Sequence, residues 1–123
     1  MVGIVPTAQV SPRVRQVHFA DAEDWHANDA ETALMMHLHP EIVRPEKLTA
    51  ADDSDRTDGC VFSHPVNRTS TNGVTGTPSA ATAEKGEMLY QHMREDLTAL
   101  IHKAITEEAP LNISYEKSIL NEL

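Results

Sequence analysis

The chain has 123 residues, with 10 Lys+Arg against 19 Asp+Glu and a formal net charge of −9, which predicts one acidic domain at most. The acidic surplus argues against a nucleic-acid partner, and no run of about 18 apolar residues is present to span a membrane. The single cysteine, Cys60, excludes a disulfide within one chain, and residues 1–6 lack a signal peptide's basic leader, so we expect a cytoplasmic protein.

The first forty residues predict two strands and a helix. Apolar residues favour short strands at residues 2–5 and 14–19, where polar and apolar side chains loosely alternate. A helix is predicted over residues 28–38, with Asn28 as N-cap and Glu31 three residues later, as in a capping box. Its apolar face would carry Ala30, Leu34 and Leu38, and Pro40 ends it.

The rest of the chain predicts an irregular segment and then a long helix. Residues 44–76 lack periodicity apart from a short predicted strand at Val61 and Phe62, and they end in a loop rich in Ser, Thr, Asn and Gly. Residues 77–107 predict an amphipathic helix about 45 Å long, starting at Thr77 and Pro78. Gly86 lies inside this helix, and a close approach to a neighbouring backbone would explain it. The tail after Leu111 fits no element.

Seven histidines raise the question of a metal site, but their spacing does not support one. On a helix, His37 and His39 would point about 200° apart. His92 and His102 are nearly three turns apart, too far for one ion. We therefore expect these four side chains to be solvated on helix surfaces.

His26 differs because it directly precedes a predicted helix. The positive end of the helix dipole favours a neutral imidazole there, and a neutral imidazole is a competent general base. Glu31 follows five residues later; spacing alone favours a capping role for this carboxylate and leaves metal binding as the alternative. Trp25, the only tryptophan, is expected to wall a small pocket.

At these residues the sequence resembles the creatininase family of creatinine amidohydrolases. Members carry His-Ala-Gly-x-x-Glu-Thr-Ser-Leu-Met and then Pro-Glu-Leu-Val; here residues 26–35 read His-Ala-Asn-Asp-Ala-Glu-Thr-Ala-Leu-Met, and residues 40–43 read Pro-Glu-Ile-Val. A second block, Asn-Gly-Val-Thr-Gly-Thr-Pro at residues 72–78 and Ala-Ala-Thr-Ala-Glu-Lys-Gly at residues 80–86, is also similar. Asn28 and Ala33 replace the family's usual glycine and serine.

The resemblance implies an α/β fold, as the C-terminal part of a three-layer α/β/α domain with a long C-terminal amphipathic helix. It also implies a metal-dependent amidohydrolase that opens cyclic amides or cleaves other C–N bonds with zinc or manganese. In such an enzyme His26 would be catalytic and move protons, Glu31 would bind the metal, and Trp25 would contact the substrate. The substrate would be a small-molecule amide.

One departure from the family concerns completeness. The family's Glu-x-His-Gly-x-His-Leu-Pro ligand motif and its Asn-Gly-His-Gly-Gly-Asn segment are not found in this sequence. We therefore expect residues 1–123 to form a single partial domain, the C-terminal half. Such a chain would be inactive alone and would work as a homo-oligomer or with a partner N-terminal half. Two alternatives stay open: an inactive remnant or interaction module of the same fold, and an unrelated small acidic helical protein.

Overall fold

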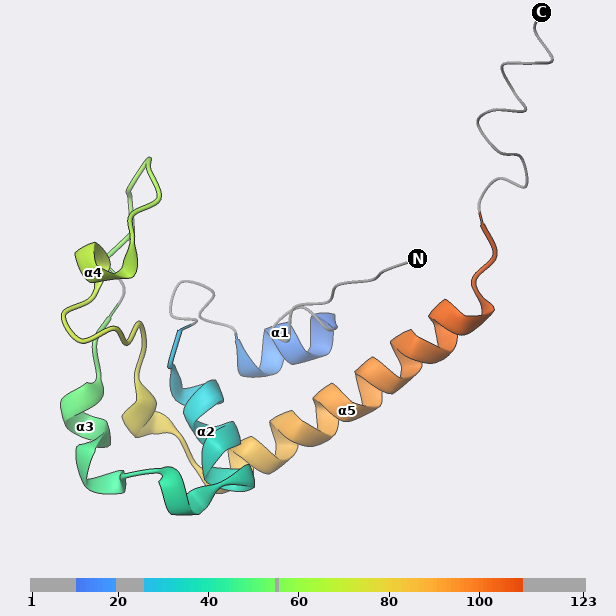
Figure 1. Cartoon of the computed structure of the whole chain (residues 1–123), viewed down its shortest axis with the longest axis horizontal. Coiled ribbons are helices and arrows are strands. Elements are labelled where there is room, and N and C mark those ends of the chain that lie inside the picture. The colour runs from blue at the N-terminus through green and yellow to red at the C-terminus, as the bar shows by residue number, and fades with distance from the viewer. Residues whose placement is uncertain (1–10, 20–25, 55, 110–123) are drawn as a thin grey trace, which may run out of the picture.

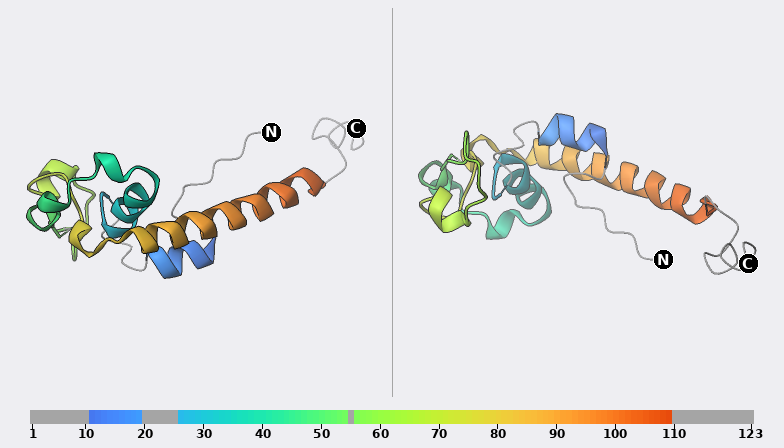
Figure 2. Two further views of the ribbon diagram at one scale, coloured as in Figure 1. Left: turned by 90° about the horizontal axis from the view of Figure 1, so that it is seen from below. Right: turned by 90° about the horizontal axis from the view of Figure 1, so that it is seen from above.

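The computed structural model describes residues 11–19, 26–54 and 56–109. Within them the elements, shown in Figure 1, follow one another as helices and 3₁₀ turns: α1 (Pro12–His18), α2 (Asp29–Leu38), η2 (Pro40–Ile42), η3 (Pro45–Lys47), α3 (Leu48–Ala51), α4 (Val66–Thr69), η4 (Pro78–Ala80) and α5 (Ala83–Thr106). Figure 2 shows α3, α4 and their loops gathered at one end of α5, while the C-terminal half of α5 projects away from the other helices.

Helix α1 replaces a predicted strand. Ser11 caps the helix, its hydroxyl accepting a hydrogen bond from the Val14 amide at 3.0 Å, and Pro12 occupies the first turn, where its missing N–H costs nothing. The strand predicted over residues 14–19 is therefore wrong, because the cap and proline outweigh a loose alternation. Val14 is fully buried and joins Phe19, Ala30 and Leu89 in the core.

Helix α2 confirms the predicted helix over residues 28–38 and its N-cap. The Asn28 side chain accepts a hydrogen bond from the Glu31 amide at 3.0 Å. Ala30 and Ala33 are the buried residues of this helix, whereas Leu38, which we expected on the apolar face, is 41% exposed. Small side chains thus form the packed face and let α5 come close.

Helix α5 confirms the predicted long helix but begins later than expected. Thr82 caps it, accepting from the Lys85 amide at 3.2 Å, while Pro78 belongs to the separate turn η4. Gly86 is buried against α2, and a Cβ placed there would lie 1.9 Å from the Ala33 carbonyl oxygen. The predicted close approach at this glycine is confirmed.

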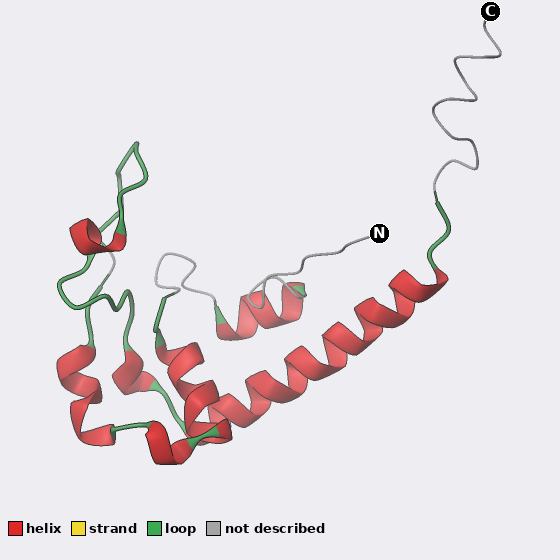
Figure 3. Cartoon of the chain, viewed as in Figure 1, coloured by secondary structure: helices red, strands yellow, loops and turns green. Residues whose placement is uncertain are grey.

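The sheet of the expected α/β architecture is not seen in the described residues, which Figure 3 shows as helices and loops. Their extended pairing is limited to two isolated antiparallel bridges, His26 with Thr75 and Asp53 with Gly76. The strand predicted at Val61 and Phe62 is wrong: both side chains project from a loop, 91% and 77% exposed. The strand predicted at residues 2–5 and the tail after residue 109 lie outside the described residues. The three-layer α/β/α arrangement is therefore not confirmed.

In the part of the chain that the structure describes, no helix combines the length and the apolar character needed to cross a bilayer. Helix α5 has the length but carries charged side chains along it, among them Glu84, Lys85, Arg94 and Lys103.

Candidate functional site

His26 is held in place by its backbone. The Thr75 amide donates to the His26 carbonyl oxygen at 2.9 Å, and the His26 amide donates to the Thr75 hydroxyl at 3.2 Å. Thr75 is itself buried. His26 is thereby fixed to a segment 49 residues away in sequence, while its side chain stays exposed.

A sharp turn separates His26 from α2. Ala27 has φ of 55°, in the left-handed region that residues with a Cβ seldom adopt. This turn lets the chain leave the bridge at His26 and enter the helix one residue after the buried cap, Asn28. His26 therefore lies just before the N-terminus of α2, as predicted, two residues ahead of the cap Asn28.

The His26 side chain lines an open cleft of about 500 Å³. Its other walls come from the loop before α4, from α4 and from the segment of Thr75. The lining residues are His26, Thr57, Cys60, Val61, Phe62, Ser63, His64, Val66, Thr69 and Thr75. The cleft thus combines imidazole, thiol and hydroxyl groups with apolar side chains, a composition suited to orienting a polar ligand of modest size.

Glu31 takes the capping position. Its carboxylate accepts a short hydrogen bond from the Ala27 amide, and its own amide donates to Asn28. Glu31 does not line the cleft that contains His26. His26 and Glu31 therefore lie close together in the sequence, but the structure does not bring their side chains into a common cavity. The metal role of Glu31 stays a prediction.

A metal site cannot be assembled from the described residues alone. Across residues 11–19, 26–54 and 56–109, no three His, Cys, Asp or Glu side chains are grouped so that they could hold an ion. His26, Cys60 and His64 share the cleft but do not form such a group. Trp25, the predicted substrate contact, lies outside the described residues.

The expectation of solvated surfaces for four histidines is only partly correct. His39 and His102 are exposed, and His39 pairs with Glu41 at 3.1 Å. His37 and His92 are half-buried: the His37 ring lies 5.8 Å from Tyr90, and His92 contacts His18. These contacts could not be predicted from the spacing of the histidines, because the partner of each lies on another helix.

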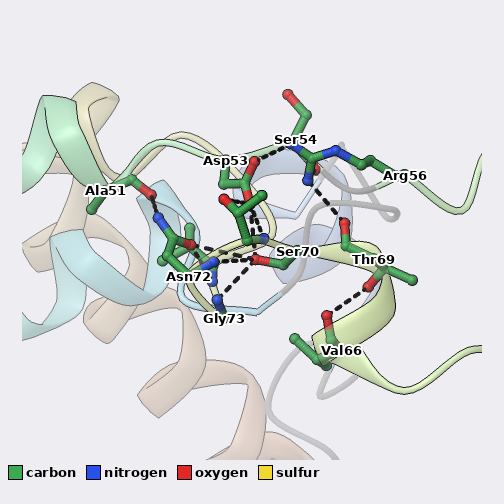
Figure 4. Close-up of polar contacts among 11 residues, drawn as sticks. Ala51, Asp53, Ser54, Arg56, Val66, Thr69, Ser70, Asn72 and Gly73 are labelled. Atoms are coloured by element: carbon green, nitrogen blue, oxygen red, sulfur yellow. Dashed lines mark hydrogen bonds and ion pairs between the residues drawn. The ribbon is translucent and has the colours of Figure 1, made fainter.

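Asp53 is a structural residue of the site that sequence reasoning missed (Figure 4). It is 8% exposed, and its carboxylate accepts hydrogen bonds from the Ser70 hydroxyl at 2.9 Å and the Thr71 amide at 2.6 Å. Arg56 pairs with the other oxygen at 2.6 Å. The Arg56 guanidinium first, and then the Thr71 amide, hold the pKa of Asp53 well below its usual range.

The hydrogen bonds of Asp53 stabilise the segment of Thr75 and Gly76, which pairs with the backbone of His26. Asp53 and Gly76 exchange backbone hydrogen bonds of 3.1 and 2.7 Å, directly beside the bridge of Thr75 to His26. The sequence signal was a run of four aspartates followed by a loop rich in hydroxyl donors; the aspartates are Asp52, Asp53, Asp55 and Asp58. Nothing in that pattern indicated which of the four aspartates would be buried.

Comparisons with known proteins identify the fold. A protein from Bacteroides fragilis NCTC 9343, named a creatinine amidohydrolase, superposes on this chain with a TM-score of 0.66 at 22% identity; the match covers 90% of this chain and 46% of the other. A mycofactocin precursor peptide peptidase of Mycobacterium ulcerans (strain Agy99) is 30% identical over 86 residues, 63% of this chain and 32% of that protein. This chain thus spans less than half the length of either relative.

A family profile gives the same assignment. The profile of the creatininase family, described as creatinine amidohydrolase, matches residues 3–101. That range includes both motif blocks and every residue that lines the His26 cleft. The chain belongs to the creatininase family.

Proposed function

We propose that this chain contributes the His26 side of the active site to a creatininase-family amidohydrolase, which hydrolyses C–N bonds of a small-molecule amide. The observation that carries the proposal is the two-point backbone grip of Thr75 on His26 at the edge of a cleft of about 500 Å³. A catalytic side chain needs a precisely placed support, and the pairing with Thr75 fixes the His26 backbone from which the imidazole extends.

His26 is assigned the proton transfer that amide hydrolysis requires. Histidine changes charge near neutral pH, so it can both accept a proton from attacking water and return one to the leaving nitrogen. His64 is the second imidazole in the cleft. Trp25, directly before His26, remains the proposed substrate contact.

The zinc or manganese ion that family membership suggests does not fit the described residues by themselves. Zinc takes about four ligands, and no group of three is present in the described ranges. Glu31 would have to release the Ala27 amide before its carboxylate could bind a cation. We therefore place most of the metal ligands on polypeptide outside this sequence, with Glu31 as a supplementary ligand.

An exposed apolar surface supports the proposal that the chain acts in an assembly. Beyond Asp96, helix α5 exposes Leu97, Ile101 and Ile105 by 43%, 50% and 75%. They follow one another at intervals of four residues and so form one apolar stripe along the half of α5 that projects from the other helices (Figure 2). Uncovered stripes of this kind are typical of surfaces that pack on another polypeptide. A partner N-terminal half or a second copy would cover it.

The test is reconstitution. The 123-residue chain is purified alone and together with a polypeptide that carries the Glu-x-His-Gly-x-His-Leu-Pro motif. Bound zinc and manganese are measured by mass spectrometry, and hydrolysis is measured on creatinine and a short peptide. We expect metal and activity in the mixture only. A mixture without metal would refute the shared metal site.

Two variants test the role of His26 separately. His26→Gln should lower kcat by about 10²- to 10⁴-fold at unchanged metal content, which is the usual contribution of a general acid–base group. The matched control is His39→Gln, an exposed histidine at the other end of α2, which should keep full activity. Equal activity of the two variants would remove His26 from the mechanism.

The second candidate function is a non-catalytic interaction module of the same fold. The specific observation that favours it is Glu31, whose carboxylate is already engaged by the helix cap. On this alternative, His26→Gln and Glu31→Ala change the free energy of unfolding, and no assembly shows hydrolysis.

A further inference from the structure

Two histidines from different helices form a contact that the proposed function does not use. Nε2 of His18, at the end of α1, lies 3.0 Å from Nδ1 of His92 on α5, and the two rings meet edge to face with centroids 5.1 Å apart. At this distance one nitrogen must carry a proton and the other must not. The contact therefore tolerates two neutral rings or one shared extra proton, but not two imidazolium ions.

The contact lies where three helices meet and where water can reach it. His18 lines a cavity of about 230 Å³ together with Asp29 of α2 and Lys85 of α5. These two charged residues form a 3.4 Å ion pair with each other, so little of the Asp29 charge is left to stabilise a protonated His18. Burial first, and then the charges of His92 and Arg13, lower the pKa of His18 from 6.5, against a smaller opposing effect of Asp29.

The opposite end of α1 is fastened by groups that keep their charge in mild acid. Arg13 pairs with Glu95 at 3.0 Å and with Asp96 at 2.5 Å, and Ser11 donates to the same Asp96 carboxylate. Hydrogen bonds from Gln91 and Arg13 lower the pKa of Glu95, and hydrogen bonds from Arg13 and Ser11 lower the pKa of Asp96. The charges of Arg13 and His92 act in the same direction on both carboxyl groups, so these groups stay ionised in mild acid. Helix α1 thus has one contact that is sensitive to protons and one that is not.

We propose that the His18–His92 contact is a proton-sensitive latch that holds the C-terminal end of α1 on α5 near neutral pH and releases it when both rings are protonated. The Ser11–Arg13 end stays bound, so release is a swing of one end rather than dissociation of the helix. Phe19, which follows His18 directly and is 8% exposed, leaves the core, and the apolar surface of Ala30 and Leu89 is uncovered.

The test follows amide exchange by NMR in the full chain between pH 7.5 and 5.0, corrected for intrinsic exchange rates. The Phe19 amide donates to the Arg15 carbonyl oxygen at 3.1 Å and reports the latched end. Its protection should fall by about tenfold or more across this range, which corresponds to a loss of about 1.4 kcal/mol in the free energy of local opening. The Leu89 amide, within α5, should keep its protection.

Two variants assign the response to the pair. His92→Gln can still hydrogen-bond but does not titrate, so it should flatten the response of Phe19. His102→Gln, an exposed histidine farther along the same helix, should keep the wild-type response. Constant Phe19 protection in the wild type, a parallel loss at Leu89, or an unchanged response in His92→Gln would each overturn the latch.

Discussion

Replacing Gly86 by alanine sets two physical effects of opposite sign against each other. Gly86 lies in the first turns of α5, where alanine would stabilise an isolated helix by about 1 kcal/mol. In the folded chain, however, the new Cβ would lie 1.9 Å from the Ala33 carbonyl oxygen and 2.5 Å from its carbon. The oxygen contact is about 1.5 Å shorter than the favourable separation of nonbonded atoms.

The clash cannot be relieved by a change of rotamer, because its partner is the backbone of α2. The two helices have to move apart, which loosens the packing around Leu89, 1% exposed, and the buried Ala33. Overpacking of this kind costs about 1–3 kcal/mol, and a rigid partner favours the upper end. After subtraction of the helix-propensity gain, we expect Gly86→Ala to lower the free energy of unfolding by about 2 kcal/mol.

The assay is urea unfolding followed by circular dichroism at 222 nm. Gly86→Ala should lower the urea midpoint of unfolding clearly, because a loss of about 2 kcal/mol is a large fraction of the total stability of a domain of this size. The matched control is Ala99→Gly, an exposed site on the same helix, where helix propensity alone predicts a loss of about 1 kcal/mol. Because Ala33 clashes through its backbone, Ala33→Gly should not rescue Gly86→Ala. A midpoint that rises in Gly86→Ala would refute the proposed close packing of α2 and α5.

Variants at three further positions test the core, the helix cap and the Asp53 network. Leu89→Ala should cost about 2–5 kcal/mol in urea unfolding, because Leu89 is buried in the core. Asn28→Ala should cost about 1 kcal/mol and Asn28→Asp much less, since aspartate also caps helices; equal losses would argue against the cap. Because the pKa of Asp53 is lowered in the folded state, its ionised carboxylate stabilises the fold at pH values above its ordinary pKa of 3.8, and this stabilisation is lost as the pH falls below that value. Acidification should therefore lower the free energy of unfolding more steeply in the wild type than in Asp53→Asn.

Local signals in the sequence predicted the helices α2 and α5, but not α1 or the short helices α3 and α4, which lie in the segment expected to be irregular. The N-cap at Asn28 and the helix of α2 could be read directly, because capping depends on residues three apart. The long helix α5 and the close approach at Gly86 were also predictable, since a glycine inside a strong apolar stripe needs a packing reason. Helix α1 was missed because Ser11 and Pro12, which start it, were weighed less than the alternation that follows.

Contacts between distant segments could not be predicted. The bridge of His26 to Thr75 and the burial of Asp53 depend on segments 49 and 17 or more residues apart, and neither leaves a periodic pattern. The same holds for the contact of His18 with His92: we expected His92 to be solvated on a helix surface, and no sequence pattern links it to His18, 74 residues away. The capping role that spacing favours for Glu31 is confirmed by its contact with the Ala27 amide, whereas the catalytic role of His26 and the metal role of Glu31 stay predictions.

The paired residues Thr75 and Gly76 bear on how the site forms during synthesis. They hold two earlier segments at once, His26 through one bridge and Asp53 through the other. A nascent chain that has left the ribosome only as far as α3 therefore has no partner for either residue, and both loops close after residue 76 emerges. The histidine motif is translated before the segment that fixes it, so its geometry is acquired only once that later segment has emerged.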